Sequence, residues 1–256
     1  MIALSLIGIG TGNPDHVTAQ AAAAIDACDL ILLPLKGTDK ADLAGLRQEI
    51  CARCITTPGT RIEAFDLPER DPATPDYHTR VADWHDAIAA RWAEVIGRHI
   101  AQGGGPRVGL LIWGDPSLYD SSLRIAERVG RLMPLTLRVI PGITAIQALC
   151  AAHAIPFNDL GAPVLVTTAR QLRARGWPRD ADRVVVMLDA GGGYAGLPGE
   201  AFHIWWGAYV GMAQERLIAG RLDAVADRIA AERASARAAH GWIMDIYLLQ
   251  RLSPAR

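Results

Sequence analysis

The chain has 256 residues, half of them hydrophobic, and a formal net charge of −1 at neutral pH. This length allows one large or two small domains with a sizeable core. The near-neutral charge argues against a general nucleic-acid binder and a polybasic membrane binder. No apolar run is long enough to span a bilayer, and residues 1–7 do not have the features of a signal peptide. We therefore expect a cytoplasmic protein.

The first half of the chain alternates expected strands and helices. Apolar runs predict strands over residues 2–7, 30–33, 61–65, 108–112 and 135–140. Apolar residues at helical spacing predict helices over residues 13–28, 42–54, 77–102, 117–132 and 143–153. Residues 66–75 contain three prolines and are expected to form a loop. This alternation is typical of parallel βαβ units.

The second half has fewer helices and more closely spaced strands. Strands are expected over residues 164–168, 184–188, 202–209, 217–218 and 242–249, with a helix over 222–238. This pattern favours a mixed sheet. We therefore expect an α/β protein with two domains, a mainly parallel N-terminal domain over residues 1–112 and a mixed C-terminal domain over 113–256. The hinge is expected near Trp113.

The cysteines do not indicate a metal centre. Cys51 and Cys54 form a CxxC pair, which could serve redox chemistry or half of a metal site. No second CxxC accompanies it, and both residues fall at the end of an expected helix. We interpret them as reduced, partly buried helix cysteines and expect no metal.

Three glycine-containing turns each follow an expected strand. They are Gly-Ile-Gly-Thr-Gly-Asn-Pro at 8–14, Trp-Gly-Asp-Pro-Ser-Leu-Tyr at 113–119 and Ile-Pro-Gly-Ile-Thr-Ala at 140–145. Turns after parallel strands meet at one edge of the sheet, so these predict a shared ligand-binding crevice. A tight turn without a ligand is the alternative for the first of them.

A nicotinamide-binding fold is disfavoured by the first turn. That fold needs G-x-G-x-x-G and an acidic residue at the end of the second strand. Here the spacing is G-x-G-x-G followed by Asn13 and Pro14, and the second strand ends in Leu-Pro-Leu-Lys at 33–36. A nicotinamide-dependent oxidoreductase is therefore kept only as an alternative.

Taken together, the three turns resemble the class III tetrapyrrole methyltransferases, which use S-adenosylmethionine. Two later features add to the resemblance, namely Met187 after a β-branched run and the Gln-Glu-Arg-Leu-Ile-Ala-Gly segment at 214–220. The resemblance implies two α/β domains with the cofactor folded in a crevice between them, and a homodimer.

The resemblance also implies a set of cofactor contacts, carried over position by position. They are Thr11, Trp113, Gly114, Asp115, Leu118, Thr144, Ala145, Met187, Gly211 and Met212. Asp115 could accept hydrogen bonds from the cofactor or bind its own turn, and Thr144 could bind the cofactor or cap a helix. Relatives usually carry Pro where Thr11 stands and Gly where Trp113 stands, which fits a subfamily with its own substrate.

Within the family, residues 10–14, 33–37, 113–120 and 205–212 resemble members that carry out one particular reaction. It is methylation of the corrinoid precursor precorrin-5 at ring carbon 1, with loss of the acetyl group as acetate, in aerobic cobalamin biosynthesis. Methylation of another ring carbon and a non-catalytic relative with the same fold are the alternatives.

Loss of an acetyl group requires a general base as well as a methyl donor. The candidates, each near an expected crevice loop, are Asp15, His16, Tyr119, Asp120 and His203. Asp120 and its neighbour Tyr119 are preferred because they directly follow the Gly-Asp-Pro turn.

Substrate carboxylates need cations. An arginine cluster at 170, 173, 175 and 179, beside Trp177, could hold them or form a solvated helix end. Trp205 and Trp206 could face the macrocycle, but their place in an apolar strand favours the core.

Overall fold

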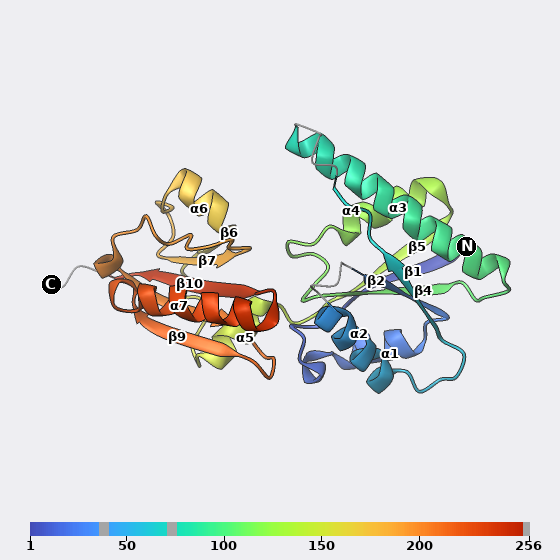
Figure 1. Cartoon of the computed structure of the whole chain (residues 1–256), viewed down its shortest axis with the longest axis horizontal. Helices are drawn as coiled ribbons and strands as arrows, with labels where there is room; N and C mark the ends of the chain where they lie inside the picture. The colour runs from blue at the N-terminus through green and yellow to red at the C-terminus, as the bar shows by residue number, and fades with distance from the viewer. Residues whose placement is uncertain (36–40, 71–75, 253–256) are drawn as a thin grey trace. The chain divides into compact units, whose positions relative to one another are not determined.

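The computed structural model describes residues 1–35, 41–70 and 76–252, with the backbone alone for 41–44 and 77. It divides into a unit of Met1–Thr144 and a unit of Ala145–Arg256, each built on its own sheet (Figure 1). This division lies later in the chain than the boundary expected between residues 112 and 113. The reason is that β5 (Leu135–Ile140) pairs in parallel with β1 (Ile2–Gly8) and completes the first sheet.

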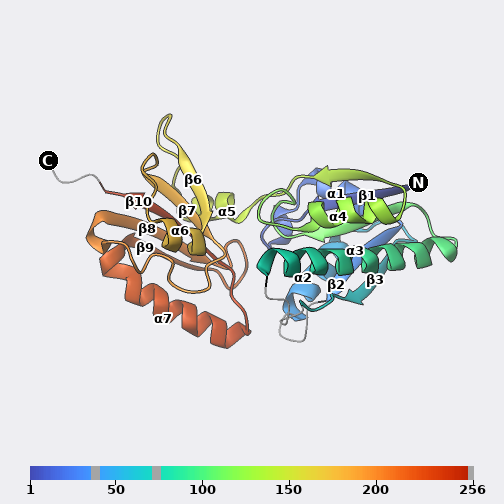
Figure 2. The same cartoon turned by 90° about the horizontal axis from the view of Figure 1, so that it is seen from above.

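The first sheet is entirely parallel, as predicted. Its other strands are β2 (Leu30–Leu35), β3 (Arg61–Asp66) and β4 (Arg107–Ile112), and the order is β3-β2-β4-β1-β5. Helices α1 (Ala19–Asp26) and α2 (Ala41–Cys54) cover one face. Helices α3 (Tyr77–Ala101) and α4 (Ser122–Leu132) cover the other, where they lie side by side (Figure 2).

Alternation along the strands divides the core of this unit between the two faces. Leu4 packs toward α3 and α4, in a cluster with Trp92 and Val129. Ile7 packs toward α1 and α2, in a cluster with Ile25. Because both faces are covered by helices, the strands are apolar on both sides, which explains the continuous apolar runs in the sequence.

Strands β2 and β4 separate before they end. They pair only over Leu30–Leu32 and Val108–Leu110, whereas β2 remains paired with β3 as far as Leu35. The C-terminal edge of the sheet therefore opens between β2 and β4, and we call this opening the fork.

The second sheet is mixed, as predicted. It contains β6 (Val164–Thr168), β7 (Arg183–Met187), β8 (Phe202–Ala208), β9 (Arg216–Arg221) and β10 (Asp245–Arg251), in the order β6-β7-β10-β8-β9. Its helices are α5 (Ala145–Ala152), α6 (Ala169–Arg175) and α7 (Leu222–His240), with a short 3₁₀ turn at Gly199–Ala201. Strand β10 runs antiparallel to both neighbours, β7 and β8, which are therefore parallel to each other.

Two predicted helix starts are wrong. Asn13 begins only a 3₁₀ turn, Pro14–His16, and α1 starts at Ala19 because Thr18 Oγ1 accepts a hydrogen bond from Ala21 N. Helix α4 starts at Ser122 rather than 117, because a longer loop follows β4.

The described residues contain no helix that is long and apolar enough to cross a membrane. Residues 36 and 37 and part of the predicted 66–75 loop lie outside the described residues.

Candidate functional site

The three glycine turns meet at the C-terminal ends of three adjacent strands, β4, β1 and β5. The first two are joined by an isolated bridge, in which Gly114 N donates to Gly10 O at 2.7 Å. The third lies against the first, as the contacts of its Gly142 show. We call these contacting turns the glycine junction. Their meeting at one edge of the sheet confirms that the three turns are neighbours, and a ligand-binding crevice beside them stays a prediction.

Two glycines of the junction serve turn-to-turn packing. A Cβ on Gly142 would lie 2.1 Å from Gly114 O, and a Cβ on Gly8 would lie 2.6 Å from Gly142 N. Both contacts are with backbone that cannot move aside cheaply. These glycines therefore let the turns touch one another.

Asp115 ties two turns of the junction together. Its Oδ1 accepts hydrogen bonds from Ser117 N, at 2.8 Å, and from Ser117 Oγ, while its Oδ2 accepts one from Gly142 N at 2.9 Å. Burial opposes ionisation of the carboxyl, but these hydrogen bonds outweigh it and lower the pKa of Asp115. Both oxygens thus have partners inside the protein, and a contact with the cofactor stays a prediction.

Other predicted cofactor residues surround the junction in the first unit. Thr11 and Thr144 are buried, and Thr11 Oγ1 lies 2.9 Å from His16 Nδ1. Leu118 is half-buried and its N–H donates to Asp115 O at 3.2 Å. The side chain of Trp113 lies in the fork, beside a cavity described below.

The remaining predicted cofactor residues belong to the second unit. Met187 ends β7, and Gly211 and Met212 follow β8. Because β7 and β8 are parallel, these residues share one edge of the second sheet. Gly211 N donates to Glu215 Oε2 at 2.6 Å, and Ala145 begins α5. That all these residues hold one cofactor stays a prediction.

The five predicted catalytic candidates have different surroundings. Asp15 is exposed and lies 3.4 Å from Arg53, and the His16 ring contacts Thr11. His203 lies near the start of β8, at the opposite end of that strand from Gly211, with its ring 4.3 Å from that of Trp205.

The two preferred candidates lie in the loop before α4. Tyr119 is 45% exposed and has a left-handed φ of 49°, which is uncommon for a residue with a side chain. Asp120 Oδ1 accepts a hydrogen bond from Ser122 N at 2.6 Å and so fixes the start of α4.

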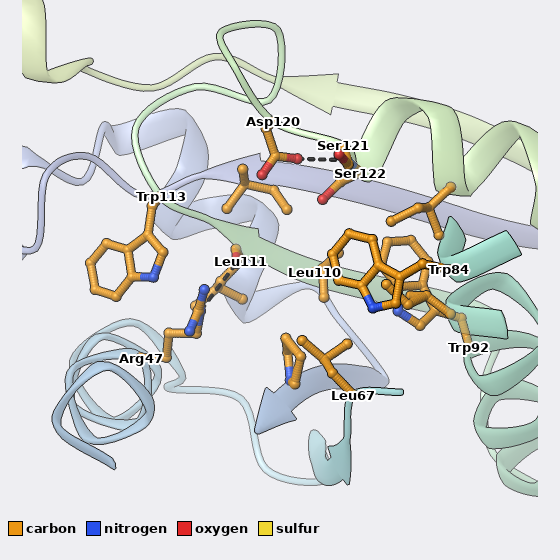
Figure 3. Close-up of a pocket in the computed structure, with 14 residues that line it drawn as sticks. Arg47, Leu67, Trp84, Trp92, Leu110, Leu111, Trp113, Asp120, Ser121 and Ser122 are labelled. Carbon is orange, nitrogen blue, oxygen red and sulfur yellow. Dashed lines mark hydrogen bonds between the residues drawn. The ribbon is translucent and has the colours of Figure 1, made fainter. Parts of the chain in front are cut away.

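A cavity of about 250 Å³ occupies the fork, and we call it the fork pocket. Figure 3 shows Asp120 and Ser122 above it, Trp84 and Trp92 of α3 beside it, and Arg47 of α2 with Trp113 on the opposite side. Asp120 is the only preferred catalytic candidate among the described residues that line it. Sequence reasoning did not find this pocket because its walls come from distant segments that only the separation of β2 and β4 brings together.

Arg47 is the functional candidate that sequence reasoning missed. Its Nε donates to Leu111 O at 3.3 Å, and its guanidinium lies 4.9 Å from the ring centre of Trp113. Burial lowers the pKa of Arg47 to about 10, and the negative charge of Asp120 partly opposes this shift. Arg47 therefore carries its charge at neutral pH. Nothing in the spacing around residue 47 distinguishes it from an ordinary surface arginine.

Comparison with known proteins shows to which family the chain belongs. The sequence model of the tetrapyrrole (corrin/porphyrin) methylases matches residues 3–226. The chain belongs to this family. It is 43% identical over 248 residues to "Precorrin-6A synthase [deacetylating]" of Sinorhizobium sp, covering 96% of this chain and 94% of that one.

Two solved structures extend the comparison. A putative cobalamin synthesis related protein (CobF) from Corynebacterium diphtheriae superposes with a TM-score of 0.83 and 36% identity, covering 99% of this chain and 100% of that one. The uroporphyrin-III C-methyl transferase of Thermus thermophilus, complexed with S-adenyl homocysteine, gives a TM-score of 0.59 with 17% identity over 97% of each chain. The second likeness is one of fold alone.

The aromatic and basic candidates of the second unit have different surroundings. Trp206 is fully buried, which confirms the core prediction for it, whereas Trp205 is half-buried. Trp177 packs against Phe202 with ring centres 4.5 Å apart. Arg173 Nη1 donates to Gly191 O at 3.3 Å, so this arginine of the predicted cluster binds the protein's own backbone.

The CxxC cysteines lie in α2, and their thiols are free, as are those of the other two cysteines. Burial raises the pKa of Cys51 to about 12, which makes its thiol unreactive at neutral pH. Across the described ranges, no group of three or more His, Cys, Asp or Glu side chains could hold a metal ion.

Proposed function

We propose that the chain transfers a methyl group from S-adenosylmethionine to ring carbon 1 of precorrin-5 and releases the acetyl group as acetate, forming precorrin-6A in cobalamin biosynthesis. The observation that carries this proposal is the 43% identity, over nearly the whole of both chains, to a deacetylating precorrin-6A synthase. As a member of the tetrapyrrole methylase family, the chain is an S-adenosylmethionine-dependent methyltransferase.

The glycine junction fits a site for that cofactor. Its turns lie at the C-terminal edge of a parallel sheet, where α/β proteins bind ligands. Gly114 has a φ of 64°, and a Cβ there would approach nothing closer than Thr144 Cα at 3.7 Å, so the junction is open beside this residue. When bound, S-adenosylmethionine supplies an already activated methyl group.

The protein's task is then to hold the two reactants in line and exclude water, which can contribute roughly 7–11 kcal/mol. We assign the holding of the cofactor to the backbone of the junction turns, with Thr11, Leu118 and Thr144 around them. Asp115 acts by keeping two of these turns in register.

Deacetylation needs a general base that accepts a proton from the attacking water. Water must add to the acetyl carbonyl, the carbon–carbon bond must break, and the electrons left on the ring carbon can then attack the methyl group. We assign the base to Asp120. Its Oδ1 is held by Ser122 N, and Oδ2 has no hydrogen-bond partner among the residues that the structure describes. That oxygen is available to accept a proton from water at the fork pocket.

A binding titration tests the cofactor assignment. Purified protein is titrated calorimetrically with S-adenosylmethionine and then, separately, with NADH. The proposal predicts saturable binding of S-adenosylmethionine and none of NADH. Binding of NADH alone would contradict it and favour the oxidoreductase alternative.

Substitution of Asp120 tests the base. Asp120→Asn keeps an oxygen that can accept from Ser122 N but removes the charge. We expect acetate release to slow by about 10²-fold or more, with unchanged affinity for S-adenosylmethionine and unchanged thermal stability. Ser121→Ala, at the neighbouring position in the pocket wall, is the matched control. Acetate release at the wild-type rate in Asp120→Asn would exclude Asp120 as the base. Cytoplasmic location, which the sequence led us to expect, and assembly as a homodimer, which the family resemblance implies, stay predictions.

A further inference from the structure

The fork leaves one backbone acceptor of β4 without a neighbouring strand. Ile112 O accepts from Ile9 N of the β1 side, so the alternating carbonyl of Leu111 points toward β2. Because β2 has already separated from β4, that carbonyl accepts from Arg47 Nε instead. This bond and the contact with the Trp113 ring fix the guanidinium at the wall of the fork pocket.

The two Nη atoms of Arg47 have no hydrogen-bond or ion-pair partner in the described part of the chain. No described carboxylate lies within 4.0 Å of it, and Nε makes its only hydrogen bond there. Asp120, which faces it across the pocket, is held by Ser122 N at the start of α4. A half-buried cation with no ion-pair partner among the described residues is well placed to bind a ligand anion.

Two indole donors of the pocket lining are also unsatisfied, one on each side. Trp92 Nε1 and Trp113 Nε1 are buried and have no hydrogen-bond partner within the described ranges. Figure 3 shows the Trp113 nitrogen on the side of the ring toward Arg47. A buried donor without an acceptor costs roughly 1–3 kcal/mol, so a ligand acceptor beside Arg47 would satisfy the Trp113 N–H.

We propose that the fork pocket is a carboxylate-binding site, in which Arg47, assisted by the indole N–H of Trp113, binds one acetate or propionate arm of the tetrapyrrole substrate. This inference rests on the proposed function, because that function supplies the polycarboxylate macrocycle. With Nε bound to Leu111 O, the two Nη atoms remain to bind both oxygens of a carboxylate side by side.

The size and charge of the pocket limit it to one arm. Its 250 Å³ is too small for a whole macrocycle, since pockets that enclose even drug-sized ligands measure about 300–1,000 Å³. Asp120 on the opposite wall repels a second anion. Arg47 thus anchors the edge of the substrate next to the residue assigned as base.

A binding cycle tests the proposal. The probes are cobyrinic acid, a corrinoid with free carboxylate arms, and its fully methylated ester, measured by equilibrium binding to the full chain saturated with S-adenosylmethionine. We expect Arg47→Gln to weaken binding of the acid at least tenfold and to leave binding of the ester within twofold. Arg53→Gln, an exposed arginine of the same helix, is the matched control and should leave both within twofold.

A milder variant guards against a folding defect. Trp113→Phe keeps the aromatic face under the guanidinium and removes only the N–H donor, so it should weaken binding of the acid threefold or more. Equal binding of the acid by wild type and Arg47→Gln, or equal losses for acid and ester, would overturn the proposal. A wild-type chain that binds S-adenosylmethionine but not the acid would also overturn it. Failure to bind S-adenosylmethionine would instead contradict the proposed function.

Discussion

At the scale of single residues, Asp115 is the side chain on which the junction depends most. Asp115→Ala removes acceptors for Ser117 and for Gly142 N, so it should lower the free energy of unfolding by about 1–3 kcal/mol. We expect affinity for S-adenosylmethionine to fall at the same time, because the two turns lose their register. Urea unfolding and calorimetric titration measure the two effects.

Ser117→Ala is the control for this substitution, since it removes one hydroxyl donor and leaves the bond to Gly142 N. It should retain most of the affinity. Full affinity in Asp115→Ala would show that the junction holds without its carboxylate, and the role assigned to Asp115 would be abandoned.

Asp29 gives stability with a defined pH dependence. It accepts hydrogen bonds from Arg107 N and Nε at 2.9 and 3.0 Å, and the guanidinium bond is the main cause that lowers the pKa of Asp29. A carboxyl with a lowered folded-state pKa stabilises the fold above its unfolded pKa, about 3.9, and loses that contribution as the pH falls through the folded pKa.

We therefore expect Asp29→Asn to destabilise the protein at pH 7, measured by urea unfolding, and the difference from wild type to shrink as the pH falls below about 4. Asp86→Asn breaks an ion pair whose aspartate is 63% exposed and should have little effect at either pH. A difference for Asp29→Asn that does not change with pH would contradict this account.

Some residue roles were predictable and others were not. The turn motifs pointed to Asp115 and Asp120, because Asp115 lies in the Gly-Asp-Pro turn and Asp120 follows that turn closely. The role of Arg47 could not be predicted, since it depends on the Leu111 carbonyl that the fork exposes. A separation of two strands leaves no local pattern in either of them.

At the scale of elements, a glycine of the junction and a glycine of helix α3 are expected to respond in opposite ways to substitution by alanine. Gly142→Ala places a Cβ 2.1 Å from Gly114 O, so it should destabilise the protein by about 1–3 kcal/mol or more. Gly97→Ala in α3 meets nothing within 4 Å and should stabilise it by roughly 0.5–1 kcal/mol. Thermal unfolding of both variants tests the pair, and equal effects would refute the packing role of the junction.

Element types followed from apolar periodicity, because strands covered on both faces and amphipathic helices have distinct patterns. Helix starts did not follow as well. Asn13 and Thr18 are both capping residues, and only the structure shows that a 3₁₀ turn separates them.

At the scale of the whole molecule, the unit boundary follows from pairing across the chain. A break after residue 112 would leave β1 without β5 and remove Ile125 and Val129 from the core. We expect a fragment of residues 1–144 to unfold cooperatively in urea and a fragment of 1–112 to show no cooperative transition. Cooperative unfolding of the shorter fragment would contradict the boundary. The sequence could not locate it, because a change in strand spacing marks a change of sheet only approximately.

The central claim is that one chain couples methyl transfer to loss of acetate. The most direct measurement is a single reaction of the purified protein with precorrin-5 and S-adenosylmethionine labelled with ¹³C in its methyl group, followed by NMR and mass spectrometry. The account predicts equal amounts of acetate, S-adenosylhomocysteine and a corrinoid labelled at carbon 1. Label on the corrinoid without acetate, or at another ring carbon, would contradict it.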